Sequence, residues 1–466
     1  MSSPLTDTAI DLRSAVTELQ SVVESEISSR LKTGTMAPSI VRVERPISSV
    51  SLIDFVRRAE AERKLYWRSR GGELEVAGLG AAEVITCAGV ADSMNIFAII
   101  HDRLENCRGN ARYYGGFRFD RFENAKPIGG EWRLLGGGQF VLPTMEFVRT
   151  GEKTVLALQA VVDPAQAFSV ESWYSEIAKC LEVDDTSSGQ FPHIVSQNVM
   201  PKREQWATNV ATALDAIEKR RTEKLVLARR VSCLFEQPVE MFALVERAFA
   251  IDQTATVFAF QLSQGVGFCG GTPELLYRRD GRQIFSEAVA GTRHQLSSAG
   301  LNSENTVQFL QSTKDRREVE IVREFIYGRL TPLCDTISTD EEPTIHQAGS
   351  VQHLRYQIAG NLRTAIGDRD ILGALSPTPA VCGLPSETAI RVIRELEHFD
   401  RGWYAGPIGW IGKESAEFAV AIRSALVCDK TVHLYSGAGI VDGSSASPEW
   451  DELDAKIATL KAALGA

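Results

Sequence analysis

Residues 274–289 read ELLYRRDGRQIFSEAV and carry the clearest fold signal in the chain. Two runs with strand-forming residues flank Asp280 and Gly281, a pair that is typical of a tight turn between antiparallel strands. The stretch therefore predicts a β-hairpin. No strict alternation of strands and helices surrounds it, so we expect an α+β architecture, one large unit of antiparallel sheets flanked by helices.

The segments on either side of this hairpin extend the same pattern. KLVLARRV (224–231) and ATVFAFQL (255–262) are typical of strands. Between about residues 40 and 180, glycine-punctuated runs such as ELEVAGLG, VITCAGV, YYGGFRFD and GGGQFVLPTMEFV predict sheet scaffolding. Apolar residues at helical spacing predict helices over 10–30, 305–329 and 448–464.

Two polar, turn-rich stretches, 184–190 and 335–349, are predicted to be loops. The first is the best internal boundary. We therefore divide the chain into a sheet-rich N-terminal half (1–195) and a catalytic region (196–462), and expect the two to be intertwined in one domain.

Composition limits the classes of function. The chain has 466 residues, of which 44% are hydrophobic and 24% charged, as in a globular protein. A formal net charge of -10 disfavours nucleic acid as a partner. With no secretory signal pattern and no membrane-spanning run, we expect neither export nor a membrane partner. Eight cysteines without a C-x-x-C pair favour a reducing cytoplasm. The histidines are dispersed, so any metal would have to be held by oxygen ligands, which are typical of magnesium.

Glu318 stands where the helical pattern predicts burial. It aligns with Ile321, Val322 and Phe325 on one face of the expected helix. A buried carboxylate needs a cation, a metal or a raised pKa. The simpler alternative, which this helix alone favours, is an ion pair with Lys314 one turn earlier.

Other charged residues have ordinary alternatives as well. Glu449 and Glu452 lie in the first turn of the last helix, where the helix dipole favours acids, and Glu452 has Lys456 one turn later. Glu274 begins the hairpin beside glycines that admit a ligand, although alone it would be an edge residue. Lys224 opens a strand and would normally be solvated. If it were desolvated near arginines, its pKa would fall from about 10.4 towards neutrality, and it could accept a proton from water.

The residues alone thus indicate an acidic enzyme with a possible magnesium site, without naming its substrate. YSGAGIVDGS (435–444) has the glycine density of a phosphate cradle but lacks the P-loop spacing. Several longer blocks are more specific. They are KLVLARR (224–230), GGTPELL (270–276), SEAVAGT (286–292), KDRREVEIV (314–322), PTPAVCGLP (377–385), FDRGWYAGPIGW (399–410), EFAVAIRSAL (417–426) and YSGAGIVDGSSASPEWDELDAK (435–456).

In these blocks the chain resembles the chorismate-utilising enzymes, the family of isochorismate, salicylate, anthranilate and aminodeoxychorismate synthases. The likeness is dense over about 200–460 and looser upstream. It implies the anthranilate synthase type of fold. It also implies Mg²⁺ ligands at Glu318 and Glu452, supported by Glu449, a water-activating base at Lys224 and an acid at Glu274 that protonates the departing hydroxyl. The remaining implied substrate contacts are Thr292, His353, Tyr404, Arg423, Gly437 and Lys456.

The resemblance also implies an activity. Lys224 and the block EAVAGT, in place of P-x-A-G-T, disfavour the ammonia-using members, so we expect no glutaminase subunit. We expect magnesium-dependent conversion of chorismate to isochorismate, serving menaquinone synthesis. Alternatives are a salicylate synthase, an isochorismate synthase of a siderophore pathway, and a chorismate-binding protein without turnover. Val319 and Ser376 depart from the family pattern, which commonly has histidine at both positions.

Overall fold

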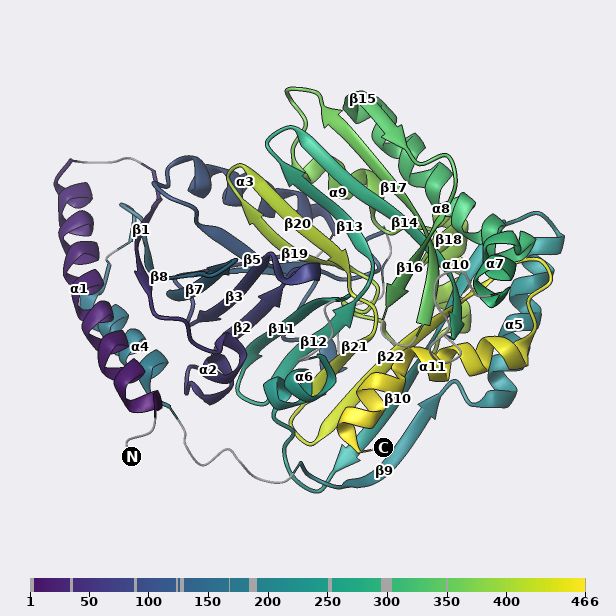
Figure 1. Ribbon diagram of the computed structural model, residues 1–466, viewed down its shortest axis with the longest axis horizontal. Helices are drawn as coiled ribbons and strands as arrows, with labels where there is room; N and C mark the ends of the chain where they lie inside the picture. The colour runs from purple at the N-terminus through teal and green to yellow at the C-terminus, as the bar shows by residue number, and fades with distance from the viewer. Residues whose placement is uncertain are drawn as a thin grey trace.

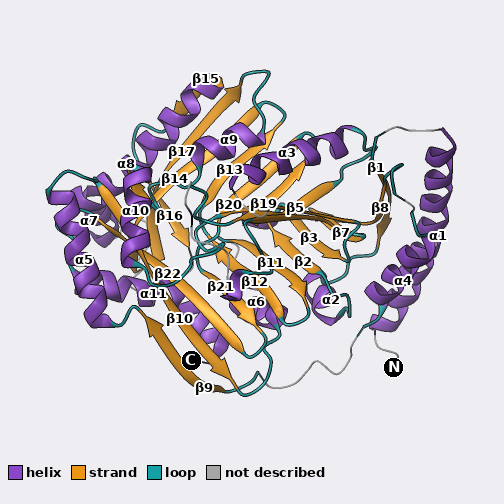
Figure 2. Ribbon diagram, turned by 180° about the vertical axis from the view of Figure 1, so that it is seen from behind, coloured by secondary structure: helices purple, strands orange, loops and turns teal. Residues whose placement is uncertain are grey.

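The computed structural model describes residues 4–33, 37–87, 90–122, 125, 130–166, 168–183, 191–249, 254–294, 304–348 and 351–465. Two large antiparallel sheets form the centre of the molecule, and helices lie around them (Figures 1 and 2). This confirms the predicted α+β class. Within the described residues, every strand pairing is antiparallel.

In the part of the chain that the structure describes, the first sheet has twelve strands. Their order is β1 (Ser39–Ile47), β8 (Lys153–Val162), β7 (Met145–Thr150), β3 (Leu74–Leu79), β2 (Lys64–Arg68), β11 (Thr256–Ser263), β12 (Val266–Thr272), β21 (Ser424–Cys428), β22 (Thr431–Ile440), β10 (Lys224–Phe235) and β18 (Gly383–Leu384), with β9 (Ile194–Met200) also beside β10.

The second sheet has ten strands among the described residues. Their order is β15 (Cys334–Thr339), β17 (Val351–Leu362), β14 (Gln283–His294), β13 (Leu275–Asp280), β20 (Ser415–Val420), β19 (Pro407–Gly412), β5 (Arg112–Phe117), β6 (Gly138–Leu142) and β4 (Glu83–Cys87), with β16 (Thr344–Ala348) also beside β17.

Helices flank the sheets, and Figure 1 shows α1 and α4 at one end of the molecule and α5 and α7 at the other. The α-helices are α1 (Pro4–Thr33), α2 (Leu52–Arg58), α3 (Val90–Glu105), α4 (Val170–Leu181), α5 (Arg203–Glu218), α6 (Met241–Phe249), α7 (Glu304–Gln311), α8 (Thr313–Leu330), α9 (Asp368–Leu375), α10 (Ser386–Leu396) and α11 (Ala446–Leu464). Short 3-10 turns occur at η1 (Arg70–Gly72), η2 (Gly130–Trp132) and η3 (Thr331–Leu333).

Both sheets contain strands from both halves of the chain. In the first, β2 pairs with β11, and in the second, β5 pairs with β19. The larger core cluster joins the sheets, since it includes Trp67 of β2 and Tyr113 and Phe418 of the second sheet. A second cluster lies between the first sheet and helices such as α1, α4 and α6. No helix among the described residues is long and apolar enough to cross a membrane.

The structure corrects three local predictions. Residues 335–348 form β15 and β16 rather than a loop, because β17 offers both strands its ladder hydrogen bonds while their polar side chains remain at the edge of the sheet. The helix predicted over 305–329 is two helices, since Ser312 separates α7 from α8 and caps α8 through Asp315 N. The hairpin turn is centred one residue later, on Gly281 and Arg282, with Gly281 at φ 53°. The predicted loop 184–190 lies outside the described residues.

Candidate active site

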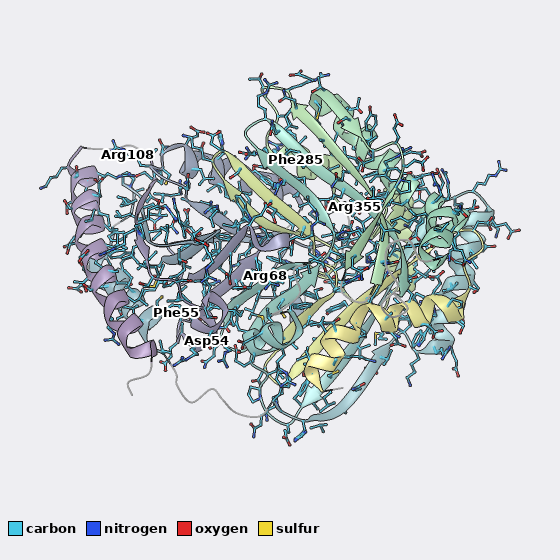
Figure 3. All side chains as sticks on the ribbon, viewed as in Figure 1. Asp54, Phe55, Arg68, Arg108, Phe285 and Arg355 are labelled. Carbon is cyan, nitrogen blue, oxygen red and sulfur yellow. The ribbon has the colours of Figure 1, made fainter. Side chains whose placement is uncertain are left out.

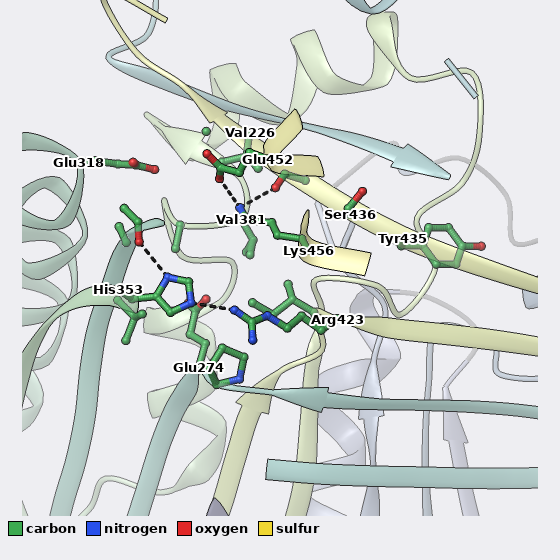
Figure 4. Close-up of a pocket in the computed structure, with 18 of the residues that line it drawn as sticks. Val226, Glu274, Glu318, His353, Val381, Arg423, Tyr435, Ser436, Glu452 and Lys456 are labelled. Carbon is green, nitrogen blue, oxygen red and sulfur yellow. Dashed lines mark hydrogen bonds and ion pairs between the residues drawn. The ribbon is translucent and has the colours of Figure 1, made fainter. Parts of the chain in front are cut away.

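A pocket lies between the two sheets, and side chains of α8 and α11 also line it (Figure 4). The cavity itself has a volume of about 70 Å³. Its walls come from β10 and β22 of the first sheet, from β14 and β17 of the second, and from the connections at 380–381, 404 and 422–423. Segments far apart in the sequence therefore contribute to one cavity.

Lys224 is fully buried at the start of β10, so the solvated alternative is wrong. Its Nζ donates to Oε1 of Glu318 at 2.9 Å. Its partner is thus a carboxylate and not an arginine, and this carboxylate satisfies the ammonium in a place that water does not reach. A Cβ atom added to Gly439 of β22 would lie 3.4 Å from Nζ, so this ammonium lies directly behind a glycine of the pocket wall.

Glu274 lies between β12 and β13 and is also buried. Burial raises the pKa of its carboxyl to about 7, although the charge of Lys224 and a hydrogen bond from Thr378 act in the opposite direction. Thr378 Oγ1 donates to Oε1 of Glu274 at 3.4 Å. Near neutral pH this group can therefore be protonated and donate a proton, unlike an ordinary glutamate.

The acidic residues predicted to bind a metal separate into two kinds. Glu318 of α8 and Glu452 of α11 both line the pocket. Burial tends to raise the pKa of Glu318, but the charge and hydrogen bond of Lys224, together with the charges of Lys456 and Lys314, outweigh burial and hold this pKa below its usual value. Glu452 forms the predicted ion pair with Lys456, at 2.7 Å, but within the pocket and not on a plain surface.

Glu449 lies apart from the pocket lining. It accepts from Lys314 Nζ at 3.1 Å, so the lysine proposed as an alternative partner of Glu318 pairs with Glu449 instead. Burial and the nearby Glu452 raise the pKa of Glu449. Three carboxylates thus have three separate lysine partners, and Glu449 is in place to support the neighbouring Glu452.

Cationic and polar groups line the opposite part of the pocket. Arg423 Nη2 donates to Nε2 of His353 at 2.8 Å, and Nδ1 of His353 donates to the carbonyl of Gly291, also at 2.8 Å. Because a guanidinium only donates, this geometry requires the neutral imidazole. Burial and the charge of Arg423 accordingly hold the pKa of His353 well below its usual value.

Arg423 itself is held in an unusual backbone conformation, with φ 49° between β20 and β21. Such a φ is uncommon for residues other than glycine and often occurs at functional sites. Lys456 Nζ donates to the carbonyl of Gly437 at 2.8 Å, and a Cβ on Gly437 would lie 2.8 Å from the Tyr404 hydroxyl. The predicted contacts at His353, Tyr404, Arg423, Gly437 and Lys456 therefore meet around one cavity. Thr292 lies in β14, but its side chain is outside the described residues.

One pocket residue and one hydrogen-bond partner of Glu274 were missed in the sequence. A Cβ on Gly439 would lie 2.6 Å from Oε1 of Glu318, so only glycine leaves room for that carboxylate. Thr378, in the block PTPAVCGLP, contacts Glu274. Both belong to blocks quoted above, but a glycine offers no functional group, and the contact of Thr378 depends on folding. Of the two residues that depart from the family pattern, Val319 is fully buried in the core and Ser376 is the C-cap of α9.

The donor set agrees with magnesium in number and chemistry. Among the described residues, no three acidic, histidine or cysteine side chains lie close enough together to hold a metal on their own. Mg²⁺, however, is commonly held by one or two carboxylates, with waters and substrate oxygens completing its octahedron. Glu318 and Glu452, which face one pocket from two helices, fit that requirement.

A pocket lined by a glutamate of raised pKa and two cationic side chains, with a buried lysine behind its wall, is typical of an enzyme for a small anionic molecule. Comparison with known proteins identifies the family. The family model "Chorismate binding enzyme" matches residues 26–465. The chain belongs to this family, which confirms the resemblance stated from its sequence blocks.

Individual relatives match over most of the chain. A chloroplastic isochorismate synthase of Catharanthus roseus is 33% identical over 82% of this chain and 67% of its own length. The isochorismate synthase MenF of Bacillus subtilis is 29% identical over 91% of this chain and 93% of its own length. The structure of MenF, the menaquinone-specific isochorismate synthase of Escherichia coli, has a TM-score of 0.78 and 25% identity, and covers 97% of this chain and 100% of the other.

Proposed function

We propose that this protein is a magnesium-dependent isochorismate synthase, which adds water at C2 of chorismate and releases the hydroxyl group from C4. The proposal is carried by two residues that lie at one pocket. Lys224 is fully buried, and burial raises the pKa of Glu274 to about 7. The names of the relatives that match along the whole chain agree with this activity.

Glu274 is the proposed general acid. A hydroxyl group is a poor leaving group until it is protonated, so the acid must still carry its proton at working pH. Burial at Glu274 meets this need by disfavouring the charged carboxylate. Thr378, at 3.4 Å, orients the carboxyl.

Lys224 is the proposed general base for the attacking water. Its Nζ lies behind Gly439 and donates to Glu318, and both of these residues line the pocket. Figure 4 labels Glu318 and Glu274 on different sides of this pocket. A base must accept a proton, so the neutral amine is the active form. Attack and departure then occur from separate walls.

Glu318 and Glu452 are the proposed Mg²⁺ ligands, with Glu449 behind Glu452. The ion would supply charge neutralisation and orientation for the ring carboxylate of the substrate. Arg423 and Lys456 supply positive charge for the substrate's anionic groups. Tyr404 and the backbone at Gly437 limit the space beside it, and neutral His353 fixes the guanidinium of Arg423 through its 2.8 Å contact.

The pathway is inferred from the likeness to a relative that covers nearly the whole chain. The solved structure that covers 97% of this chain is described as menaquinone-specific, so we propose menaquinone synthesis as the pathway, in the cytoplasm. We further propose that water, not ammonia, is the second substrate, so that no glutaminase subunit is required. A salicylate synthase remains the second candidate, because the same acid and base would form isochorismate before pyruvate is eliminated.

Product analysis tests the activity. Purified protein is incubated with chorismate, with Mg²⁺ or with EDTA, and products are separated by chromatography with mass detection. Magnesium-dependent isochorismate without pyruvate is the expected result. Salicylate with pyruvate would assign the second candidate, aminated products on addition of ammonium would contradict the water-only proposal, and unchanged chorismate would contradict turnover altogether.

A further inference from the structure

A turn in the N-terminal half reaches the wall behind the proposed acid. It follows β2 and contains Arg70, Gly71 and Gly72, and both glycines are left-handed, with φ 80° and 74°. Ser69 fixes its start, since its Oγ accepts from Trp67 Nε1 at 3.2 Å and donates to Oε2 of Glu417 on β20 at 2.9 Å. The turn is therefore anchored to both sheets.

Arg70 makes two contacts from this turn. Nη1 donates to the carbonyl of Pro273 at 3.2 Å, and Pro273 directly precedes Glu274 and lines the pocket. Nη1 and Nη2 also donate to Oε2 and Oε1 of Glu287 on β14, at 2.8 and 2.6 Å. Two parallel hydrogen bonds from one guanidinium to one carboxylate fix the orientation of both groups. One guanidinium thus holds both the backbone before the acid and a neighbouring carboxylate.

Glu287 is the negative neighbour of Glu274. It is buried, and its charge acts to raise the pKa of Glu274. The other groups that act on Glu274 are Lys224 from β10, Lys456 from α11 and the hydroxyl of Thr378, and all three act to lower this pKa. Arg355 of β17 is a second, longer partner of Glu287, at 3.4 Å. Figure 3 labels Arg355, together with Arg68 of β2, in the central part of the molecule.

We propose that Arg70 positions the general acid Glu274. Arg70 fixes the backbone at Pro273 and balances the charge of Glu287 next to Glu274. The inference rests on the proposed role of Glu274. It gives the N-terminal half a specific part in the reaction, because Arg70 acts on a group that the other half supplies.

A purely structural role for Arg70 makes different predictions. A residue that only stabilises the fold would change the amount of active enzyme and leave the pH dependence of each molecule unchanged. A residue that balances charge beside the acid shifts the pH at which activity is lost. The two substitutions Arg70→Met and Glu287→Gln also remove opposite charges, so their shifts have opposite signs.

The test measures kcat and kcat/KM for isochorismate formation between pH 5.5 and 9 in the full-length enzyme. The variants are Arg70→Met, Glu287→Gln and the double substitution, with thermal unfolding of each as a check on folding. Arg278→Met is the matched control. Arg278 lines a second pocket together with Arg70 and Glu287, but it pairs with Glu73 and not with Pro273 or Glu287. It is expected to retain the wild-type profile.

In Arg70→Met the pH above which activity falls should be higher than in the wild type. The negative charge of Glu287 then lacks its main cationic partner and raises the pKa of Glu274 further. In Glu287→Gln the pH above which activity falls should be lower, and in the double variant it should return towards the wild-type position. Arg70→Met and the double variant should both lose about tenfold or more in kcat, because misplacement by about 1 Å can cost about a hundredfold.

Shifts in the same direction, or an unshifted profile in folded variants, would overturn the inference. That failure differs from failure of the proposed function. If the protein is not an isochorismate synthase, the wild type forms no isochorismate, and if Glu274 is not the acid, Glu274→Gln keeps its activity. Should Arg70→Met not fold, the opposite shift expected of Glu287→Gln against the Arg278→Met control still decides the charge argument.

Discussion

At Glu274, removal from water and the neighbouring charges act in opposite directions on one carboxyl. Burial is the larger influence and raises its pKa, whereas Lys224, Thr378 and Lys456 lower it. The outcome, a pKa of about 7, suits an acid that must hold a proton near neutrality. At Glu318 the balance is reversed, because Lys224 lies in direct contact and keeps the carboxylate charged. Similar residues thus acquire different chemistry from their contacts.

The pH dependence of the wild type follows from Glu274. The acid must be protonated, so kcat/KM for isochorismate formation should fall as pH rises above about 7, the pKa of this carboxyl. In Glu274→Gln the new side chain has the same size as glutamate, but its amide cannot supply the proton, so kcat should fall by about 10²–10⁴. The measurement is a pH series of both enzymes with unfolding curves as control. A wild type whose activity is unchanged up to pH 9 would contradict this assignment.

Gly439 gives a prediction based on space alone. A Cβ in Gly439→Ala would lie 2.6 Å from Oε1 of Glu318 and 3.1 Å from Cε of Lys224, so the pair must separate. We expect kcat to fall by about tenfold or more and the Mg²⁺ concentration for half activity to rise. Gly328→Ala, on α8 with no neighbour within 4 Å of the added Cβ, is the control and should retain activity. Equal activity of the two variants would contradict the role of Gly439.

At the scale of elements, a buried ion pair joins two segments of the pocket wall to the end of α10. Arg401 donates to the carbonyls of Val226 on β10 and Val381 in the loop before β18, both at 2.8 Å. It also pairs with Glu397 at the end of α10, and Glu397 accepts from the backbone N–H of Ala228 at 2.7 Å. The loop and β10 are therefore held in register by side chains outside the pocket.

Loss of this ion pair should destabilise the fold. Arg401→Met removes the cation beside Glu397 where both side chains are 3% exposed, and should cost about 3–5 kcal/mol in free energy of unfolding. Lys413→Met breaks a pair with Glu105 that is 38% and 49% exposed, and should cost at most about 1 kcal/mol. Denaturant unfolding compares the two. A similar small cost in both would contradict the structural role of Arg401.

For the whole molecule, the two halves of the chain should depend on each other for folding. Residues 191–466 without the N-terminal half would expose β11 and β19, whose partners β2 and β5 are missing. Unpaired strands in mid-sheet are prone to aggregation. We expect this fragment to be insoluble or to unfold without cooperativity, and co-expression with residues 1–183 to restore folding. A cooperative transition in the fragment alone, measured by circular dichroism, would contradict the intertwined arrangement.

Local patterns were sufficient for much of the fold. The hairpin at 274–289, the strands at 224–231 and 255–262 and the helix ending at Leu464 follow from alternation, helical spacing and turn residues, and the structure confirms them. The errors arose where partners are distant. Residues 335–348 are polar, and only the ladder offered by β17 makes them strands. Ser312 divides a helix that its apolar spacing presents as continuous.

Local periodicity and the order of the motifs, which are properties of the chain alone, were enough to predict the class of fold and the family. The tertiary structure decided the partners. It paired Lys224 with Glu318 and Lys314 with Glu449, placed Thr378 against Glu274, and brought Arg70 to Pro273. These contacts join residues up to 203 positions apart, and burial and charge act through distance in space, which no local pattern contains.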